Sequence, residues 1–165
     1  MYLEPQTLYL APMDAERLRA FLLTLPHVAE TMQWGANLVF WVGDKAIGGK
    51  MFALIDLDEP HQSGHHNLPP VISYAAGSAR MSDLLELDGL IPAPYFARAH
   101  WVAALRWDVF SAADWQRELR AAHALTLGRL PQKARATLAL PAAKQKALIA
   151  ARRKLLAAKA TKTKK

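Results

Sequence analysis

Residues 92–107 read PAPYFARAHWVAALRW, and the expected fold follows from this segment and its neighbours. The two prolines favour a turn, because proline fixes φ and cannot donate a backbone hydrogen bond. A strand is therefore expected to begin after Phe96. Over residues 100–107 the bulky apolar side chains occupy odd positions and His and Arg occupy even ones. This alternation is typical of a half-buried antiparallel strand.

The flanking segments carry helix and strand signals in an order typical of an α+β domain. Asp14, Ser78 and Ser111 are candidate helix caps, each followed by apolar residues at helical spacing. Residues 27–36 read as a connection. Helices are expected over about 14–25, 78–87 and 111–128, and further strands over 38–42, 45–57 and 71–74. The predicted fold is an antiparallel sheet with helices packed on it.

Composition narrows the class of protein. The chain has 165 residues, of which 52% are hydrophobic and five are Trp, enough for one domain with a substantial core. The sequence has no cysteine, which excludes a disulfide framework, a thiolate nucleophile and a Cys-based zinc site. No signal peptide is visible, and no run reaches the ~18 apolar residues of a membrane span. We expect a soluble, cytoplasmic protein without a cofactor, monomeric by default.

The net charge of +7 is unevenly distributed. Residues 1–118 hold 8 Lys/Arg and all 14 Asp/Glu, a net of −6, whereas residues 119–165 hold 13 Lys/Arg and no acid, a net of +13. A polyanionic partner would therefore be bound mainly by the C-terminal part. The expected organisation is a folded domain over residues 1–137 and a Lys/Ala-rich arm over residues 138–165, helical or disordered.

The arm carries the strongest functional signal. Neutralising phosphates releases condensed counterions, so a run of cations without acids predicts binding to DNA, with RNA as the alternative, and a steep salt dependence. Lysines in this composition have no base-reading geometry, so no sequence preference is expected. The simpler interpretation is a solvated extension that aids solubility. The candidate contacts in the arm are Lys144, Lys146, Arg152, Arg153, Lys154, Lys159, Lys162, Lys164 and Lys165.

The folded part offers weaker nucleic-acid candidates. Arg98 and Arg106 lie beside aromatic residues, a mixture that single-strand binders use to pair phosphates and stack bases. Lys133 is a third candidate contact. Aromatic residues at strand spacing are more often core, and the acidity of this part of the chain also argues against a nucleic-acid surface.

Other functions have specific but weaker candidates. A protein- or small-ligand-binding module would use an aromatic pocket near Trp34, Tyr95 and Trp101. An enzyme would use His27, Glu30 or His100 as acid or base, but the sequence has no Gly-rich phosphate loop, serine nucleophile motif or His-Glu-x-x-His. The non-catalytic interpretation is preferred.

One loop is rich in potential metal ligands. Three histidines and three acids lie within eleven residues, but no regular element fixes their spacing, and a structural zinc site needs an ordered tetrahedral set. We therefore expect a mobile loop and no metal site. The residues concerned are Asp56, Asp58, Glu59, His61, His65 and His66.

The order of several short motifs over about residues 14–136 resembles the MmcQ/YjbR family of small bacterial proteins. The resemblance implies a frataxin-like (CyaY-like) two-layer α+β fold. Members are usually described as DNA-binding, so the resemblance also implies that function. The motifs are Leu25-Pro26-His27-Val28-Ala29-Glu30 followed by Trp34-Gly35, Gly49-Lys50-Met51-Phe52-Ala53, Pro94-Tyr95 leading to His100-Trp101-Val102, and Leu130-Pro131-Gln132-Lys133-Ala134-Arg135.

Overall fold

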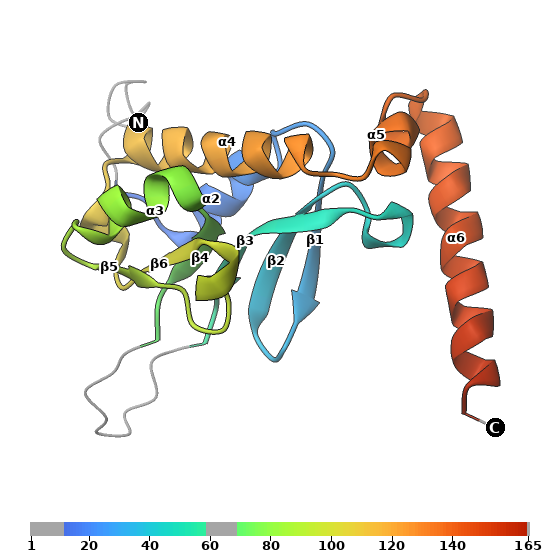
Figure 1. Ribbon diagram of the computed structural model, residues 1–165, viewed down its shortest axis with the longest axis horizontal. Helices are drawn as coiled ribbons and strands as arrows, with labels where there is room; N and C mark the ends of the chain where they lie inside the picture. Colours follow the sequence, from blue (N-terminus) through green and yellow to red (C-terminus); the bar gives the residue numbers. More distant parts are fainter. Residues whose placement is uncertain (1–11, 59–68, 165) are drawn as a thin grey trace, which may run out of the picture.

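The computed structural model describes residues 12–58 and 69–164. Six antiparallel strands form one sheet in the order β1-β2-β3-β4-β6-β5 (Figure 1). The chain therefore has the expected α+β fold. The strands are β1 (Val28–Gln33), β2 (Asn37–Val42), β3 (Lys50–Asp56), β4 (Ile72–Ala75), β5 (Leu90–Pro92) and β6 (Trp101–Ala104).

Helices cover one face of this sheet and extend beyond it. The long helix α4 packs on β2, β3 and β4 and also contacts α2, whereas α3 packs against β5 and β6. Figure 1 shows α4 lying along the sheet, with α6 at the far end of the molecule. The helices are α2 (Ala15–Leu22), α3 (Ser78–Leu85), α4 (Ala112–Gly128), α5 (Gln132–Leu138) and α6 (Ala142–Lys162).

Two of the three expected caps are present. The Asp14 carboxylate accepts a hydrogen bond from the Arg17 amide at 2.8 Å, and the Ser111 hydroxyl accepts one from the Asp114 amide at 3.1 Å. Each satisfies an amide that the first helical turn leaves without an intrahelical acceptor. The expected cap at Ser78 is wrong, because Gly77 occupies the N-cap position and no side chain caps α3.

The core between α4 and the sheet is centred on Trp115. Its indole is fully buried and contacts the rings of Tyr74, Trp107 and Phe110 at 5.0–6.2 Å between centroids. Its Nε1–H donates to the Trp107 carbonyl at 2.8 Å, so the one polar group of the side chain is satisfied. Trp115 thus ties α4 to β4 and to the segment after β6.

A β-bulge in β3 determines which side chains face the helices. The register shifts between Phe40 and Trp41, so that Phe52 has no partner of its own. Phe52 and Ala53 consequently both face α4, where the Phe52 ring contacts the ring of His123. Leu54, the next residue, faces the opposite side of the sheet.

Three sequence expectations about strands are wrong. The strand expected over residues 45–57 begins only at Lys50, because residues 45–47 form a 3-10 turn. Residues 28–33 are not a connection but the edge strand β1, paired along its length with β2. The segment after Phe96 first forms a 3-10 helix, η2 (Ala97–Ala99), and β6 begins only at Trp101. All four β6 residues are buried, because the strand lies between β4 and β5 and is covered on both faces.

A compact turn, η1 (Lys45–Ile47), joins β2 to β3 and supports the C-terminal helix. Gly49 closes this turn, because a Cβ at that position would lie 1.9 Å from the Gly43 carbonyl oxygen. The Asp44 carboxylate caps η1 by accepting from the Ala46 amide at 2.8 Å. The turn is therefore fixed by backbone contacts that leave no room for a side chain.

Residues 142–162 form one continuous helix, α6, which is the helical one of the two alternatives expected for the arm. Helix α5 ends at Leu138, which is buried, one residue past the expected end of the folded domain. No helix in residues 12–58 and 69–164 is long and apolar enough to span a bilayer.

Candidate functional sites

The first half of α6 is held against the folded domain by one side of the helix. Gln145, Ile149 and Arg153 recur every four residues; Gln145 and Ile149 are half-buried, and Arg153 forms an ion pair with Asp44 of the η1 turn. The Gln145 amide also donates to the Leu138 carbonyl at 3.0 Å. This side fixes the direction in which α6 leaves the domain.

The remaining cations of α6 and its C-terminal end face solvent. All are exposed, and none forms an ion pair with any acid of the described chain. The helix itself has no acidic residue, so its positive field is not compensated locally. These seven outward cations are Lys144, Lys146, Arg152, Lys154, Lys159, Lys162 and Lys164.

Three other candidate nucleic-acid contacts do not belong with these seven outward cations. Arg153 is neutralised by Asp44. Arg106 pairs with both Asp88 and Asp108, and its hydrogen bond to Asp88 is the main reason that its pKa is raised. The charge of each guanidinium is therefore already balanced by a carboxylate of the folded domain. Lys165 lies outside the described residues.

The two other candidates of the folded part are exposed but lie in different places. Lys133 is in α5, immediately before α6, whereas Arg98 is in η2, which contacts β6. In the sheet order, β6 is separated from β2, which leads into the η1 turn, by β3 and β4. The structure therefore places Lys133 with the basic helix and Arg98 apart from it.

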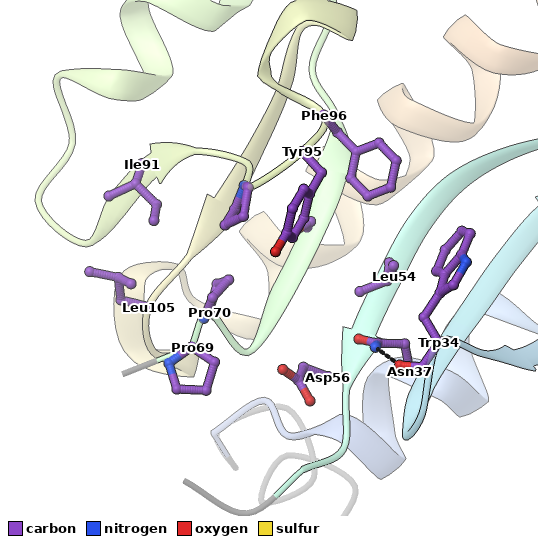
Figure 2. A pocket seen from close by; sticks show the side chains of 12 residues that line it. Trp34, Asn37, Leu54, Asp56, Pro69, Pro70, Ile91, Tyr95, Phe96 and Leu105 are labelled. Atoms are coloured by element: carbon purple, nitrogen blue, oxygen red, sulfur yellow. Dashed lines mark hydrogen bonds between the residues drawn. The ribbon is translucent and has the colours of Figure 1, made fainter. Parts of the chain in front are cut away.

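A second candidate site is a cavity of about 1180 Å³ on the face of the sheet that α4 leaves uncovered (Figure 2). Its floor includes Leu54 and Ser73, which are register partners in β3 and β4. Loops that connect the strands supply the walls. The cavity is lined by Trp34, Asn37, Leu54, Asp56, Pro69, Pro70, Ser73, Ile91, Pro94, Tyr95, Phe96 and Leu105.

Besides the aromatic residues, three polar side chains line this cavity. Asn37 donates through Nδ2 to the Trp34 carbonyl at 2.8 Å, the dashed line in Figure 2, which leaves its Oδ1 as an acceptor. Asp56 accepts from the Asp58 amide at 2.9 Å through Oδ1. The Ser73 hydroxyl has no hydrogen-bond partner in the described chain, although its residue is only 5% exposed. In addition to the Tyr95 hydroxyl, the cavity thus offers the Ser73 hydroxyl and the acceptor oxygens of Asn37 and Asp56 among apolar walls.

Two of the aromatic residues at the cavity adopt a left-handed backbone conformation. Trp34 has φ +49° and Tyr95 has φ +67°, and Tyr95 is completely exposed while Trp34 is 60% exposed. Bulky residues rarely adopt such angles, and strained positions of this kind cluster at functional sites. Neither side chain is explained by burial in the core.

Replacing Tyr95 with Gly is expected to stabilise the fold by about 0.5–1 kcal/mol. Relief of the left-handed strain is worth roughly 1–2 kcal/mol, and the added entropy of glycine in the unfolded chain offsets about 0.5–1 kcal/mol of it. Urea denaturation followed by circular dichroism measures the difference. Tyr95→Ala, which keeps the strain, serves as the control. A less stable Tyr95→Gly protein would contradict this account.

The sequence predicted an aromatic pocket near Trp34, Tyr95 and Trp101, and the first two of these residues line the cavity. Trp101 is buried, and Phe96 lies over it with ring centroids 5.2 Å apart, so Phe96 lines the cavity instead. Sequence reasoning also missed Asp56, which it assigned to a loop of acids and histidines. The Pro69-Pro70 pair after that loop was the only signal of a rigid wall there.

In the described chain, no hydrogen bond or ion pair joins the candidate acid–base residues His27, Glu30 and His100 to one another. The Glu30 carboxylate is held by the guanidinium of Arg19, which contacts both of its oxygens. His27 and His100 are exposed turn residues with positive φ. Residues 59–68, which include the three loop histidines, lie outside the described residues, and the described part contains no cluster of three or more metal-ligating side chains.

A buried polar group joins three elements on the helix side of the sheet. The Tyr74 hydroxyl donates to Glu118 Oε2 at 3.1 Å, and Arg80 of α3 binds the other carboxylate oxygen. Burial, followed by the charge of Glu118, raises the pKa of Tyr74, so the phenol stays protonated. Because Tyr74 is fully buried and faces α4, this group stabilises the packing of β4, α3 and α4.

Comparisons with known proteins agree with the resemblance seen in the sequence. The family model YjbR matches residues 23–125. The chain is also similar to the crystal structure of Deinococcus radiodurans protein DR2400, described as domain DUF419, with a TM-score of 0.63 and 25% identity over 80% of this chain and 93% of that chain. No curated protein matches. Because the family model covers more than half of the sequence, the chain belongs to the YjbR family, with α5 and α6 beyond the matched segment.

Proposed function

We propose that this protein binds nucleic acid, duplex DNA in the first place, through the outward cations of α6. The observation that supports this proposal is that α6 and its C-terminal end carry seven exposed cations without an ion-pair partner among the described residues, and no acid. Phosphate backbones attract such a surface, and the release of their counterions supplies the free energy. The ion pair between Arg153 and Asp44 holds the helix in a fixed direction, so the cations are presented rather than tethered loosely.

The binding is expected to be independent of sequence. Phosphate contacts position a protein on a duplex, but base edges must be read by hydrogen bonds of fixed geometry. The side chains of α6 that face solvent are chiefly Lys, Arg, Leu and Ala, and none of the outward cations is held by a neighbouring group of the described chain. Flexible lysines of this kind follow the charge of the backbone rather than the base sequence.

The test replaces Lys154, Lys159, Lys162 and Lys164 with Gln. These lysines lie beyond Arg153, so the substitution leaves the docked side of α6 intact. We expect the affinity for a labelled duplex, measured by fluorescence anisotropy at about 50 mM salt, to fall at least about tenfold.

A matched control removes the same number of charges from elsewhere. It replaces Lys50, Arg98, Arg120 and Arg129, all exposed and all outside α5 and α6, with Gln. The affinity of this variant for the duplex is expected to fall less than about threefold, since the cations that it lacks are dispersed rather than aligned along one helix. An equal loss in both variants would show that net charge matters and the helix does not, which would contradict the proposal. Full binding by the α6 variant would contradict it directly.

A further inference from the structure

Among the described residues, the cavity on the open face of the sheet is lined by a negative charge and no positive one. Asp56 is the only carboxylate in the described lining, which contains no Lys, Arg or His. One Asp56 oxygen accepts from the Asp58 amide, and the carboxylate forms no ion pair with any described residue. This part of the lining offers no compensating charge to a phosphate or carboxylate ligand, whereas it does to a cation.

The walls favour a ligand with a flat apolar body. The exposed rings of Trp34 and Tyr95 and the ring of Phe96 lie around the cavity, with Trp34 and Tyr95 on either side of Leu54 in Figure 2. Trp34 and Phe96 are 6.3 Å apart between ring centroids, close enough to form one aromatic wall. Aromatic faces attract cations through their quadrupole, and tryptophan does so most strongly.

The site is separate from the basic helix. Asn37, which lines the cavity, is the first residue of β2, and Val42 at the other end of the strand leads into the η1 turn that carries α6. A strand of six residues spans about 20 Å. Helix α6 contacts the domain at this turn and stands apart from the sheet at the far side of the molecule (Figure 1), so its cations do not line the cavity.

We propose that this cavity binds a small organic cation with a flat apolar body, of the arylalkylammonium class. The ammonium lies at Asp56, beside its register partner Asn37, and the aromatic part lies between Trp34, Tyr95 and Phe96. This activity is independent of the DNA-binding proposal, because it uses none of the same residues.

Three indole probes of nearly equal shape test the assignment. Tryptamine carries a positive charge, indole-3-propionamide none, and indole-3-propionate a negative one. They are titrated into ¹⁵N-labelled full-length protein while the Trp34 indole N–H signal is followed by NMR. Tryptamine is expected to bind with a Kd of about 1 mM or better. The amide should bind several-fold more weakly, and the propionate should not bind measurably.

Asp56→Asn is expected to weaken tryptamine about fivefold and to leave the amide unchanged, because a partly exposed ion pair contributes about that factor. Asparagine retains the oxygen that accepts from the Asp58 amide, so the loop keeps its hydrogen bond. Asp58→Asn removes the same charge two residues away, outside the lining residues. It should leave tryptamine binding unchanged.

A second variant tests the aromatic wall. Trp34→Ala, read out on the Ser73 amide signal, should weaken tryptamine and the amide by similar factors. Equal affinity for all three probes would overturn the proposal. So would an effect of Asp58→Asn as large as that of Asp56→Asn, or the absence of any saturable shift up to about 10 mM tryptamine.

Discussion

The affinity of the full-length protein for duplex DNA is expected to fall about 100-fold when the salt concentration rises from about 50 to about 200 mM. A straight helix can present only part of its circumference to a duplex, so about four of the seven outward cations of α6 would meet phosphates at one time. Each phosphate neutralised contributes about −0.9 to the slope of log affinity against log salt.

The same measurement distinguishes an electrostatic helix from other modes of binding. Anisotropy titrations at five salt concentrations give the slope for the parent protein and for two variants at Lys154, Lys159, Lys162 and Lys164. The Gln variant should have a much shallower slope, whereas the Arg variant, which keeps all four charges, should keep it. A slope near zero for the parent protein would contradict the proposed function, as would an unchanged slope for the Gln variant.

The charge partition behind this prediction was fully visible in the sequence, because it needs only the order of residues along the chain. The state of individual cations was not. Arg153 is paired with Asp44, which lies 109 residues earlier, and Arg106 is shared between Asp88 and Asp108. Ion pairs of this kind depend on how the chain folds back, so composition overestimates the number of free cations in a candidate surface.

Local sequence signals predicted the helices better than the edge strand of the sheet. The caps at Asp14 and Ser111 were correct because a cap involves residues within one turn of each other. The edge strand β1 was missed because its six residues are nearly all half-buried and show no clear alternation. Its identity as a strand comes from pairing with β2, which a pattern within one segment does not reveal.

The cavity shows the same limit for sites. Trp34 and Tyr95 were found because exposed aromatic residues near turns stand out in a sequence. Asp56 and Ser73 were not found. They lie within β3 and β4, and they face the cavity because side chains alternate between the two faces of the sheet. In β3 the bulge at Phe52 determines which residues face the cavity, because a one-residue shift moves every later side chain of the strand to the other face.

The strongest expected effect on stability comes from the helix side of the sheet, at Trp115. Replacing it with Ala should lower the free energy of unfolding by about 4 kcal/mol. The substitution removes a fully buried indole that contacts three other rings and leaves the Trp107 carbonyl without its donor. A loss of this size is a large fraction of the roughly 5–15 kcal/mol that stabilises a typical domain.

Urea denaturation followed by far-ultraviolet circular dichroism measures this change without relying on tryptophan fluorescence. Trp34→Ala is the matched control, because the same atoms are removed from a side chain that is 60% exposed; it should cost less than about 1 kcal/mol. Trp115→Phe keeps most of the ring contacts and should cost about 2 kcal/mol. If Trp115→Ala cost no more than Trp34→Ala, α4 would not be held to the sheet through Trp115. In that case the face that carries the cavity would contribute as much to the free energy of unfolding as the face that packs against α4.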